Sequence, residues 1–311
     1  MRSSRSPVDL STTVGTVRLR SPVMTASGTG GHGAELARYL DLAALGAVVT
    51  KSVSADPWPG NPAPRVHETA AGMLNAVGLQ GPGVAAWLAD ELPELLATGA
   101  TVVASIWGRS VDDYRRAADL LAAAPPQVVA VEVNLSCPNV EDRAGMFAHS
   151  AAATEAAMAA TVGCGRPRWA KLSPNVADLV PIADAAVRGG AEALTLVNTV
   201  LGMAIDPETR GYRLGNGGGG LSGAAIHPVA VRAVHDVAAA RPQLPLVGVG
   251  GVVDGPTAIE LLLAGASAVQ VGTATFADPR AAAKVQAGLE HWCRRHDVRG
   301  AGELIGAIHG H

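Results

Sequence analysis

The stretch Val128-Val129-Ala130-Val131-Glu132-Val133-Asn134-Leu135-Ser136-Cys137-Pro138-Asn139 begins as a strand and ends as a polar loop. Its β-branched run predicts a strand that ends at Asn134. A thiol, Cys137, follows three residues later between two amides, on a loop stiffened by Pro138. A thiol in that place can carry proton or nucleophile chemistry, or it can be an inert buried side chain.

The same rhythm repeats on both sides of this strand. Short β-branched runs alternate with Ala- and Leu-rich amphipathic segments, without a break in composition. A short hairpin around Gly15, within residues 8–20, is expected to precede them. Strands are expected near 23–26, 47–51, 101–105, 128–134, 168–172, 193–197, 245–249 and 268–272. Helices are expected near 34–43, 84–97, 111–123, 151–162, 177–188, 227–240, 255–264 and 279–295.

Eight strand–helix alternations predict an α/β fold, a (β/α)8 TIM barrel that forms a single domain over residues 1–311. A doubly wound sheet is the alternative. It usually carries GxGxxG after its first strand, and Gly28-Thr29-Gly30-Gly31 lacks that spacing. Barrel chemistry lies at the carboxyl ends of the strands. Two long loops, 53–83 and 200–222, follow strands on that face and predict a roofed site.

Composition excludes several classes of protein. Hydrophobic residues make up 48% of the chain and charged residues 16%, which supports a large core and excludes disorder. A net charge of −3 gives no electrostatic field that favours nucleic acid. No apolar run reaches the roughly 18 residues that span a bilayer, and we expect a soluble, cytoplasmic protein. The three cysteines are too scattered for a disulfide framework or an iron–sulfur cluster, and no metal-ligand spacing is present.

Glycines and lysines gather at the expected strand ends. Gly250-Gly251 and Gly272-Thr273 end the last two strands, and Gly220-Leu221-Ser222-Gly223 precedes a helix. Barrels commonly bind phosphate there, although glycines can also serve only to permit tight turns. Lys51 and Lys171 also end strands, where a buried lysine needs an anion. A phosphate site leaves both flavin mononucleotide (FMN) and a phosphorylated sugar open as ligands.

Amides complete the expected site. Asn75, Asn134 and Asn198 each offer a hydrogen-bond donor and an acceptor. Singly, each is typical of turns, but with Cys137 they can bind the amide and carbonyl edges of a small planar heterocycle. No carboxylate ends a strand, since Glu132 lies inside its strand, so a glycosidase and a divalent metal site are disfavoured.

One loop and seven further stretches resemble a known family. The sequence Asn134-Leu135-Ser136-Cys137-Pro138-Asn139-Val140 resembles the catalytic loop of class 1 dihydroorotate dehydrogenases, and the resemblance extends over nearly the whole chain. The other stretches resemble class 1B, the NAD-linked type. They are GNPAPR (60–65), GMLNAVGLQ (72–80), KLSPNV (171–176), NT (198–199), GGLSG (219–223), GGV (250–252) and GASAV (265–269).

The resemblance implies an FMN-containing barrel that oxidises (S)-dihydroorotate to orotate in pyrimidine (UMP) biosynthesis. Cys137 would be the base that removes the C5 proton, while hydride passes from C6 to the flavin. The residues implied to bind FMN are Ser27, Lys51, Ser52, Ser105, Asn134, Lys171, Val197, Gly223, Gly250, Gly251, Gly272 and Thr273. The residues implied to bind the substrate are Lys51, Asn75, Ala76, Val77, Gly78, Leu79, Asn134, Asn198 and Thr199.

The chain departs from the family pattern in two places. After Asn139-Val140 the family usually has a basic residue and a Gly-Gly pair, whereas this chain has Glu141-Asp142-Arg143-Ala144-Gly145. This is the loop expected to close over the substrate, so the change bears on turnover and on substrate identity. Ser105 stands where class 1B members often carry Asn, but its hydroxyl can still donate a hydrogen bond to FMN.

The resemblance also implies partners. They are a second copy of the chain, in a homodimer, and an electron-transfer subunit with FAD and a [2Fe–2S] cluster that passes electrons to NAD⁺. Without that subunit the chain must use another soluble acceptor. Three alternatives stay open: a related FMN oxidoreductase for another dihydropyrimidine, a flavin-free phosphate-binding barrel isomerase, and a non-catalytic flavin-binding protein. The quinone-linked, membrane-bound class, which uses Ser as its base, resembles this chain less.

Overall fold

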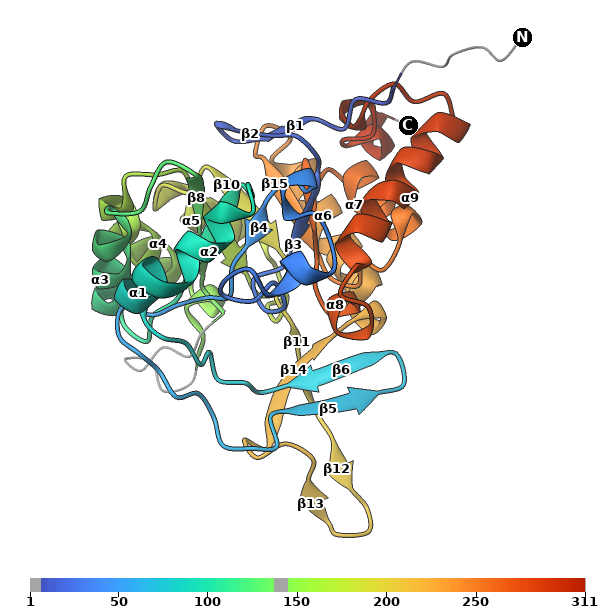
Figure 1. Ribbon diagram of the computed structural model, residues 1–311. Coiled ribbons are helices and arrows are strands. Elements are labelled where there is room, and N and C mark those ends of the chain that lie inside the picture. The colour runs from blue at the N-terminus through green and yellow to red at the C-terminus, as the bar shows by residue number, and fades with distance from the viewer. Residues whose placement is uncertain (1–6, 137–144, 311) are drawn as a thin grey trace.

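The computed structural model describes residues 7–136 and 145–310, and its central element is an eight-stranded parallel barrel. The strands follow the order β3-β16-β15-β10-β9-β8-β7-β4, and a parallel bridge between Met24 and Ala47 joins the two ends. The predicted TIM barrel is confirmed (Figure 1). Its strands are β3 (Val23–Thr25), β4 (Val48–Val49), β7 (Val102–Ile106), β8 (Val128–Asn134), β9 (Arg168–Leu172), β10 (Ala193–Leu196), β15 (Leu246–Val249) and β16 (Ala268–Val271).

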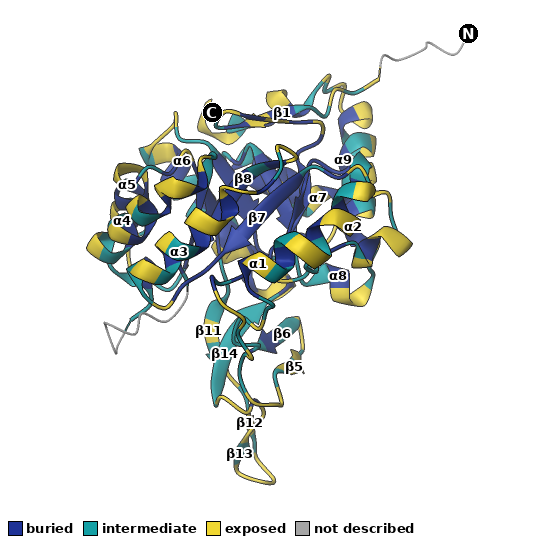
Figure 2. Ribbon diagram, turned by 60° about the vertical axis from the view of Figure 1, so that its left-hand side comes forward, coloured by how far each residue is buried: buried dark blue, intermediate teal, exposed yellow. Residues whose placement is uncertain are grey.

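Helices surround the barrel and turn their apolar faces towards it (Figure 2). Side chains cap several of them, as where Ser110 accepts a hydrogen bond from the backbone N–H of Asp113. None of the described helices is both long and apolar enough to cross a membrane. The helices are α1 (Val84–Ala86), α2 (Leu92–Ala97), α3 (Val111–Leu121), α4 (Ala151–Ala160), α5 (Val180–Arg188), α6 (His227–Ala240), α7 (Gly255–Leu263), α8 (Ala274–Ala277) and α9 (Ala281–Arg295). A π-helical turn, η3 (Trp87–Glu91), joins α1 to α2, and shorter 3-10 turns are η4 (Phe147–His149), η5 (Thr161–Cys164), η6 (Ala224–Ile226), η7 (Ala301–Glu303) and η8 (Ala307–Gly310).

The helix expected over residues 34–43 is wrong. Two 3-10 turns, η1 (Glu35–Arg38) and η2 (Leu42–Ala44), occupy that region. Asp41 lies between them with an extended backbone, and its carboxylate accepts a hydrogen bond from the N–H of Ala43. Because an aspartate that caps the next turn cannot continue the previous one, no regular helix spans the two.

An N-terminal hairpin closes one end of the barrel, as its sequence predicts. Strands β1 (Thr12–Val14) and β2 (Val17–Leu19) pair across Gly15, which has a φ of +59°. Val14 and Val17 are buried in a cluster with barrel-interior side chains that include Trp169. Figure 1 shows the hairpin at the end opposite to the long loops, so only the carboxyl end of the barrel is left for a ligand.

The two long loops fold into a second sheet that covers this carboxyl end. Its strand order is β11-β14-β6-β5, and all its pairs are antiparallel. Its strands and those of an attached pair are β5 (Val66–Thr69), β6 (Gly72–Asn75), β11 (Val200–Met203), β12 (Ile205–Asp206), β13 (Gly211–Tyr212) and β14 (Gly218–Ser222). We call these six strands the roof; they project from one end of the barrel in Figures 1 and 2.

Candidate active site

A cavity of about 710 Å³ lies between the carboxyl ends of the barrel strands and the roof. Residues from nearly every predicted strand end line it, together with both long loops. The predicted site residues that line it are Ser27, Lys51, Ser52, Asn75, Ala76, Val77, Gly78, Leu79, Asn134, Lys171, Val197, Asn198, Thr199, Gly223, Gly250, Gly251, Gly272 and Thr273. Cys137 and the altered residues 141–144 lie outside the described residues. The structure thus brings together almost the whole predicted set.

Ser105 differs from the other predicted residues because it does not line the cavity. Its side chain is fully buried, and its hydroxyl lies 2.8 Å from the hydroxyl of Ser52. Ser52 lines the cavity directly. Ser105 is therefore placed to orient Ser52 rather than to contact a ligand itself.

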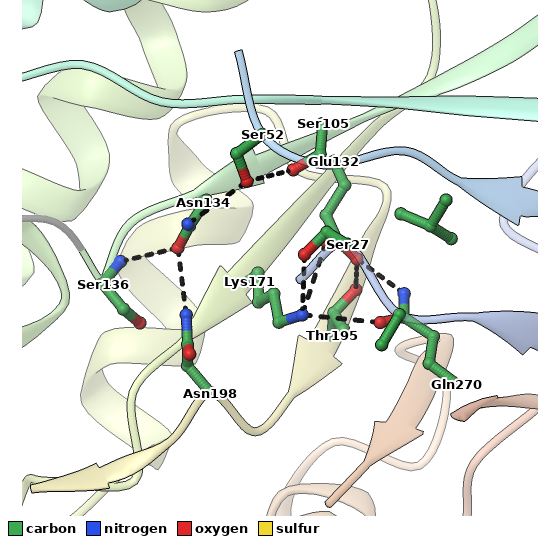
Figure 3. Close-up of polar contacts among 12 residues, drawn as sticks. Ser27, Ser52, Ser105, Glu132, Asn134, Ser136, Lys171, Thr195, Asn198 and Gln270 are labelled. Atoms are coloured by element: carbon green, nitrogen blue, oxygen red, sulfur yellow. Dashed lines mark hydrogen bonds and ion pairs between the residues drawn. The ribbon is translucent and has the colours of Figure 1, made fainter. Parts of the chain in front are cut away.

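The floor of the cavity holds a buried ion pair (Figure 3). Lys171 Nζ lies 3.6 Å from Glu132 Oε1, 3.1 Å from Ser27 Oγ and 3.5 Å from Gln270 Oε1. The other carboxylate oxygen, Glu132 Oε2, accepts hydrogen bonds from Gln270 Nε2 at 2.6 Å and from Thr195 Oγ1 at 3.0 Å. Five side chains from five strands or strand ends therefore form one polar network at the cavity floor.

Glu132 is the functional residue that the strand-end analysis missed. Its side chain is completely buried, two residues before Asn134 in β8. Alternation along a strand puts both residues on the same face, and that face is the barrel interior. A glutamate inside an otherwise apolar strand was the available signal, because a buried carboxylate requires a partner.

Amides form one side wall. Asn134 Oδ1 accepts hydrogen bonds from Asn198 Nδ2 at 3.1 Å and from the N–H of Ser136 at 3.2 Å, and Asn134 Nδ2 donates to Ser52 Oγ at 3.4 Å. Asn198 Oδ1 in turn accepts from the N–H of Thr199. Figure 3 shows Ser52, Asn134 and Asn198 in a row to one side of Lys171. The network fixes the orientation of these polar groups along one wall of the cavity.

Lys51 brings a second positive charge to the cavity. It is half-buried, and burial, followed by repulsion from Arg65, lowers the pKa of its ammonium. Within the described part of the chain this ammonium has no hydrogen-bond or ion-pair partner. A half-buried lysine without a protein partner is suited to an anionic ligand.

Glycines form a cradle beside β15 and β16. Gly223, Gly250 and Gly251 have φ values of +95°, +137° and +69°. A Cβ atom at Gly250 would lie 2.7 Å from Ala230 Cβ, and one at Gly251 would lie 2.6 Å from His227 Cβ. Only glycine lets this backbone pack so closely on α6, and Gly223, Gly250 and Gly251 all line the cavity. Thr273 Oγ1 donates to Ser222 Oγ at 2.8 Å beside the cradle, which completes a site suited to a phosphate.

Aromatic side chains that the sequence analysis did not single out line the cavity mouth. The rings of Trp58 and Trp107 meet edge to face at 5.9 Å, and the Arg109 guanidinium lies 4.4 Å from the centre of the Trp58 ring. These residues come from two different strand–helix loops. No periodicity links them in sequence, so only the folded structure brings them together.

The chain is similar to proteins of known family. Residues 9–293 match the family described as dihydroorotate dehydrogenase. The chain is 51% identical over 297 residues to a protein of Desulforudis audaxviator named dihydroorotate dehydrogenase B (NAD(+)), catalytic subunit, with 94% of each chain covered. It is 46% identical over 301 residues to the protein of the same name from Geotalea daltonii, with 96% of this chain and 98% of the relative covered.

Proposed function

The chain belongs to the dihydroorotate dehydrogenase family, and from this premise we propose that it oxidises (S)-dihydroorotate to orotate in pyrimidine biosynthesis. The family implies an oxidoreductase with a flavin, and we propose that the flavin is FMN. The observation that carries the proposal is Lys51, a half-buried cation in the cavity whose ammonium has no hydrogen-bond or ion-pair partner among residues 7–136 and 145–310. Dihydroorotate carries a carboxylate that can meet this cation.

The described residues fit FMN. The cradle of Gly223, Gly250, Gly251, Gly272 and Thr273 suits its phosphate, because a Cβ atom at three of these glycines would enter occupied space. Lys171 and the amide wall face the same cavity and suit the polar edge of its ring system. When bound, FMN supplies the acceptor for hydride.

The substrate is assigned to the wall that holds Lys51. Its ammonium binds the carboxylate, while the amides of Asn75, Asn134 and Asn198 bind the ring carbonyl and N–H groups. The hydrogen bonds among Asn134, Asn198 and Thr199 orient these amides before the substrate arrives. Oxidation requires that the C5 proton leave while hydride leaves C6, so the protein must place a base at C5.

We assign that base to Cys137. Its support is the sequence, where a thiol follows the strand that ends at Asn134. Asn134 and Ser136 line the cavity, so the chain leaves the described part directly beside the proposed substrate wall. At neutral pH a thiol forms the thiolate that can take a proton more readily than a serine hydroxyl forms an alkoxide.

Two partners belong to the proposal. The relatives are named catalytic subunits, so a further subunit accompanies them, and we propose an electron-transfer subunit with FAD and a [2Fe–2S] cluster for this chain.

We also propose a homodimer. The roof supports it by exposing Leu201, Met203, Ile205 and Tyr212, each more than half exposed. Sedimentation velocity of the wild type and of Met203→Asp tests the dimer.

Anaerobic flavin reduction tests the function. Purified protein is expected to be yellow, and dihydroorotate is expected to bleach it within the dead time of manual mixing. Dihydrouracil, which lacks the carboxylate, is the matched substrate and is expected to bleach it far more slowly. A flavin that dihydroorotate does not reduce, or that both compounds reduce equally well, contradicts the assignment.

A second comparison tests the base. Cys137→Ala is expected to keep its flavin and to lose most dihydroorotate-dependent reduction at neutral pH, since general acid–base catalysis contributes about 10²–10⁴-fold. Cys164→Ala is the control, because Cys164, the last residue of η5, is buried and does not line the cavity. Unchanged reduction by Cys137→Ala would rule out the thiol as base.

A further inference from the structure

Glu132 lies one layer beneath the cavity floor. Its side chain is fully buried and is not among the residues that line the cavity, whereas Lys171 lines it. The Lys171 ammonium therefore stands between the carboxylate and the ligand. The 3.6 Å between Lys171 Nζ and Glu132 Oε1 is an ion-pair distance and too long for a hydrogen bond.

The carboxylate is held in one orientation by neutral donors. Gln270 Nε2 and Thr195 Oγ1 both donate to Oε2, which leaves Oε1 facing Lys171. Within the described residues Oε1 accepts no hydrogen bond. Among the described residues Lys171 is therefore the charged partner of this oxygen, and the two charges interact across a short distance in a medium of low dielectric constant.

We propose that Glu132 is a positioning residue that holds the Lys171 ammonium at the cavity floor and offsets part of its charge, and thereby lowers the reduction potential of the flavin. The inference rests on the proposed function, since it requires a flavin over Lys171. A cation beside a flavin favours the added electrons, and a carboxylate beneath the cation opposes this effect. Because the formal charges of Lys171 and Glu132 nearly cancel, the distance between them sets their net effect on the reduction potential of the flavin.

Potentiometry on the flavin-loaded protein tests the inference. Glu132→Gln keeps the shape and removes the charge, so the midpoint potential is expected to rise. A tenfold change in the equilibrium constant corresponds to about 30 mV for a two-electron couple, and the shift is expected to be at least of this size. Lys171→Met is expected to shift the potential in the opposite direction. Thr195→Val removes a neutral donor to the same carboxylate and is the control, with a much smaller shift.

A double variant keeps the test decisive. If Glu132→Gln alone does not fold, the combination of Glu132→Gln with Lys171→Met carries no unpaired charge. The difference between its midpoint potential and that of Lys171→Met then measures the effect of the carboxylate charge. Glu132→Asp keeps the charge and is expected to restore most of the wild-type potential. Equal potentials with and without the Glu132 charge, in proteins that all contain flavin, overturn the inference alone. A wild-type protein that binds no flavin overturns the proposed function as well, and flavin content separates the two results.

Discussion

Two lysines at the carboxyl end of the barrel differ in what surrounds them. Lys171 is almost completely buried in the floor, where it meets Glu132, Ser27 and Gln270. Lys51 is half-buried in the wall, and the part of the chain that is described offers its ammonium no partner. The difference teaches that a strand-end lysine can be neutralised by the protein as part of its structure, or left to be neutralised by a ligand.

The position of each strand explains the difference. β9 lies between β8 and β10, and Lys171 pairs in register with Asn134 on one side and Thr195 on the other. Glu132 of β8 therefore reaches its ammonium, while Thr195 of β10 holds the Glu132 carboxylate. Lys51 follows the short strand β4, beyond the end of the regular ladder. After burial, repulsion from Arg65 is the second cause of its lowered pKa.

The largest expected effect on stability is that of Lys171→Met. This change leaves the Glu132 carboxylate buried without its cation, which is expected to cost about 3–5 kcal/mol of the free energy of unfolding. Urea denaturation of the apoprotein measures it. Combining the change with Glu132→Leu is expected to recover most of the loss, because an apolar pair can replace a buried ion pair. Lys284→Met, at an exposed lysine of the surface, is the control.

Lys51→Met is expected to change stability little and to weaken substrate binding. It removes an unpartnered cation, so the free energy of unfolding should stay within about 1 kcal/mol of the wild type or rise. Affinity for orotate should fall by roughly 10²-fold, since a charge-assisted contact in a desolvated site is worth about 2–5 kcal/mol. Calorimetric titration with orotate checks this. An unchanged orotate affinity would remove Lys51 from the substrate site.

The pH dependence of stability and of orotate binding also reports on Lys51. Burial lowers the pKa of Lys51 in the folded protein below its usual 10.5, so the unfolded chain binds more protons between the two values. Stability from this group therefore rises with pH in that window, while affinity for an anion falls as pH rises through the folded pKa. Orotate titrations and urea unfolding above neutral pH should show both slopes in the wild type. Neither slope should survive in Lys51→Met.

The smallest expected effect is that of Ser105→Ala. The change removes the hydroxyl 2.8 Å from Ser52 but no residue that lines the cavity. One hydrogen bond in a buried network is worth about 1 kcal/mol, so stability should fall by that amount. FMN affinity, measured by fluorescence titration of the apoprotein, should fall less than in Ser52→Ala. A larger loss in Ser105→Ala would mean that Ser105 contacts the ligand directly.

Much of the barrel could be predicted because its local patterns agree with its tertiary structure. The β-branched run of β8, the mixed strand β9 and the amphipathic helix α6 have the bounds expected from sequence. Two long loops over the site were predicted, but the strands that they form in the roof were not. Its strand β14 is Gly218-Gly219-Gly220-Leu221-Ser222, which has no alternation of apolar and polar residues. Glycine is needed there because a Cβ atom at Gly219 would lie 2.5 Å from the carbonyl oxygen of Asn75, a contact formed between distant segments.

The sequence by itself determined which residues end the strands, and so which side chains gather at the carboxyl end of a barrel. Lys51, Asn134 and Lys171 were predicted there and line the cavity. Only the tertiary structure decided which of these side chains satisfy one another. The pairing of Lys171 with Glu132 depends on the register of β8 against β9. That no described residue pairs with the Lys51 ammonium depends on which side chains the neighbouring loops place beside it. The spacing of residues along the chain predicts neither the Lys171 pairing nor the surroundings of Lys51, because both depend on distances between segments that meet only when the barrel closes.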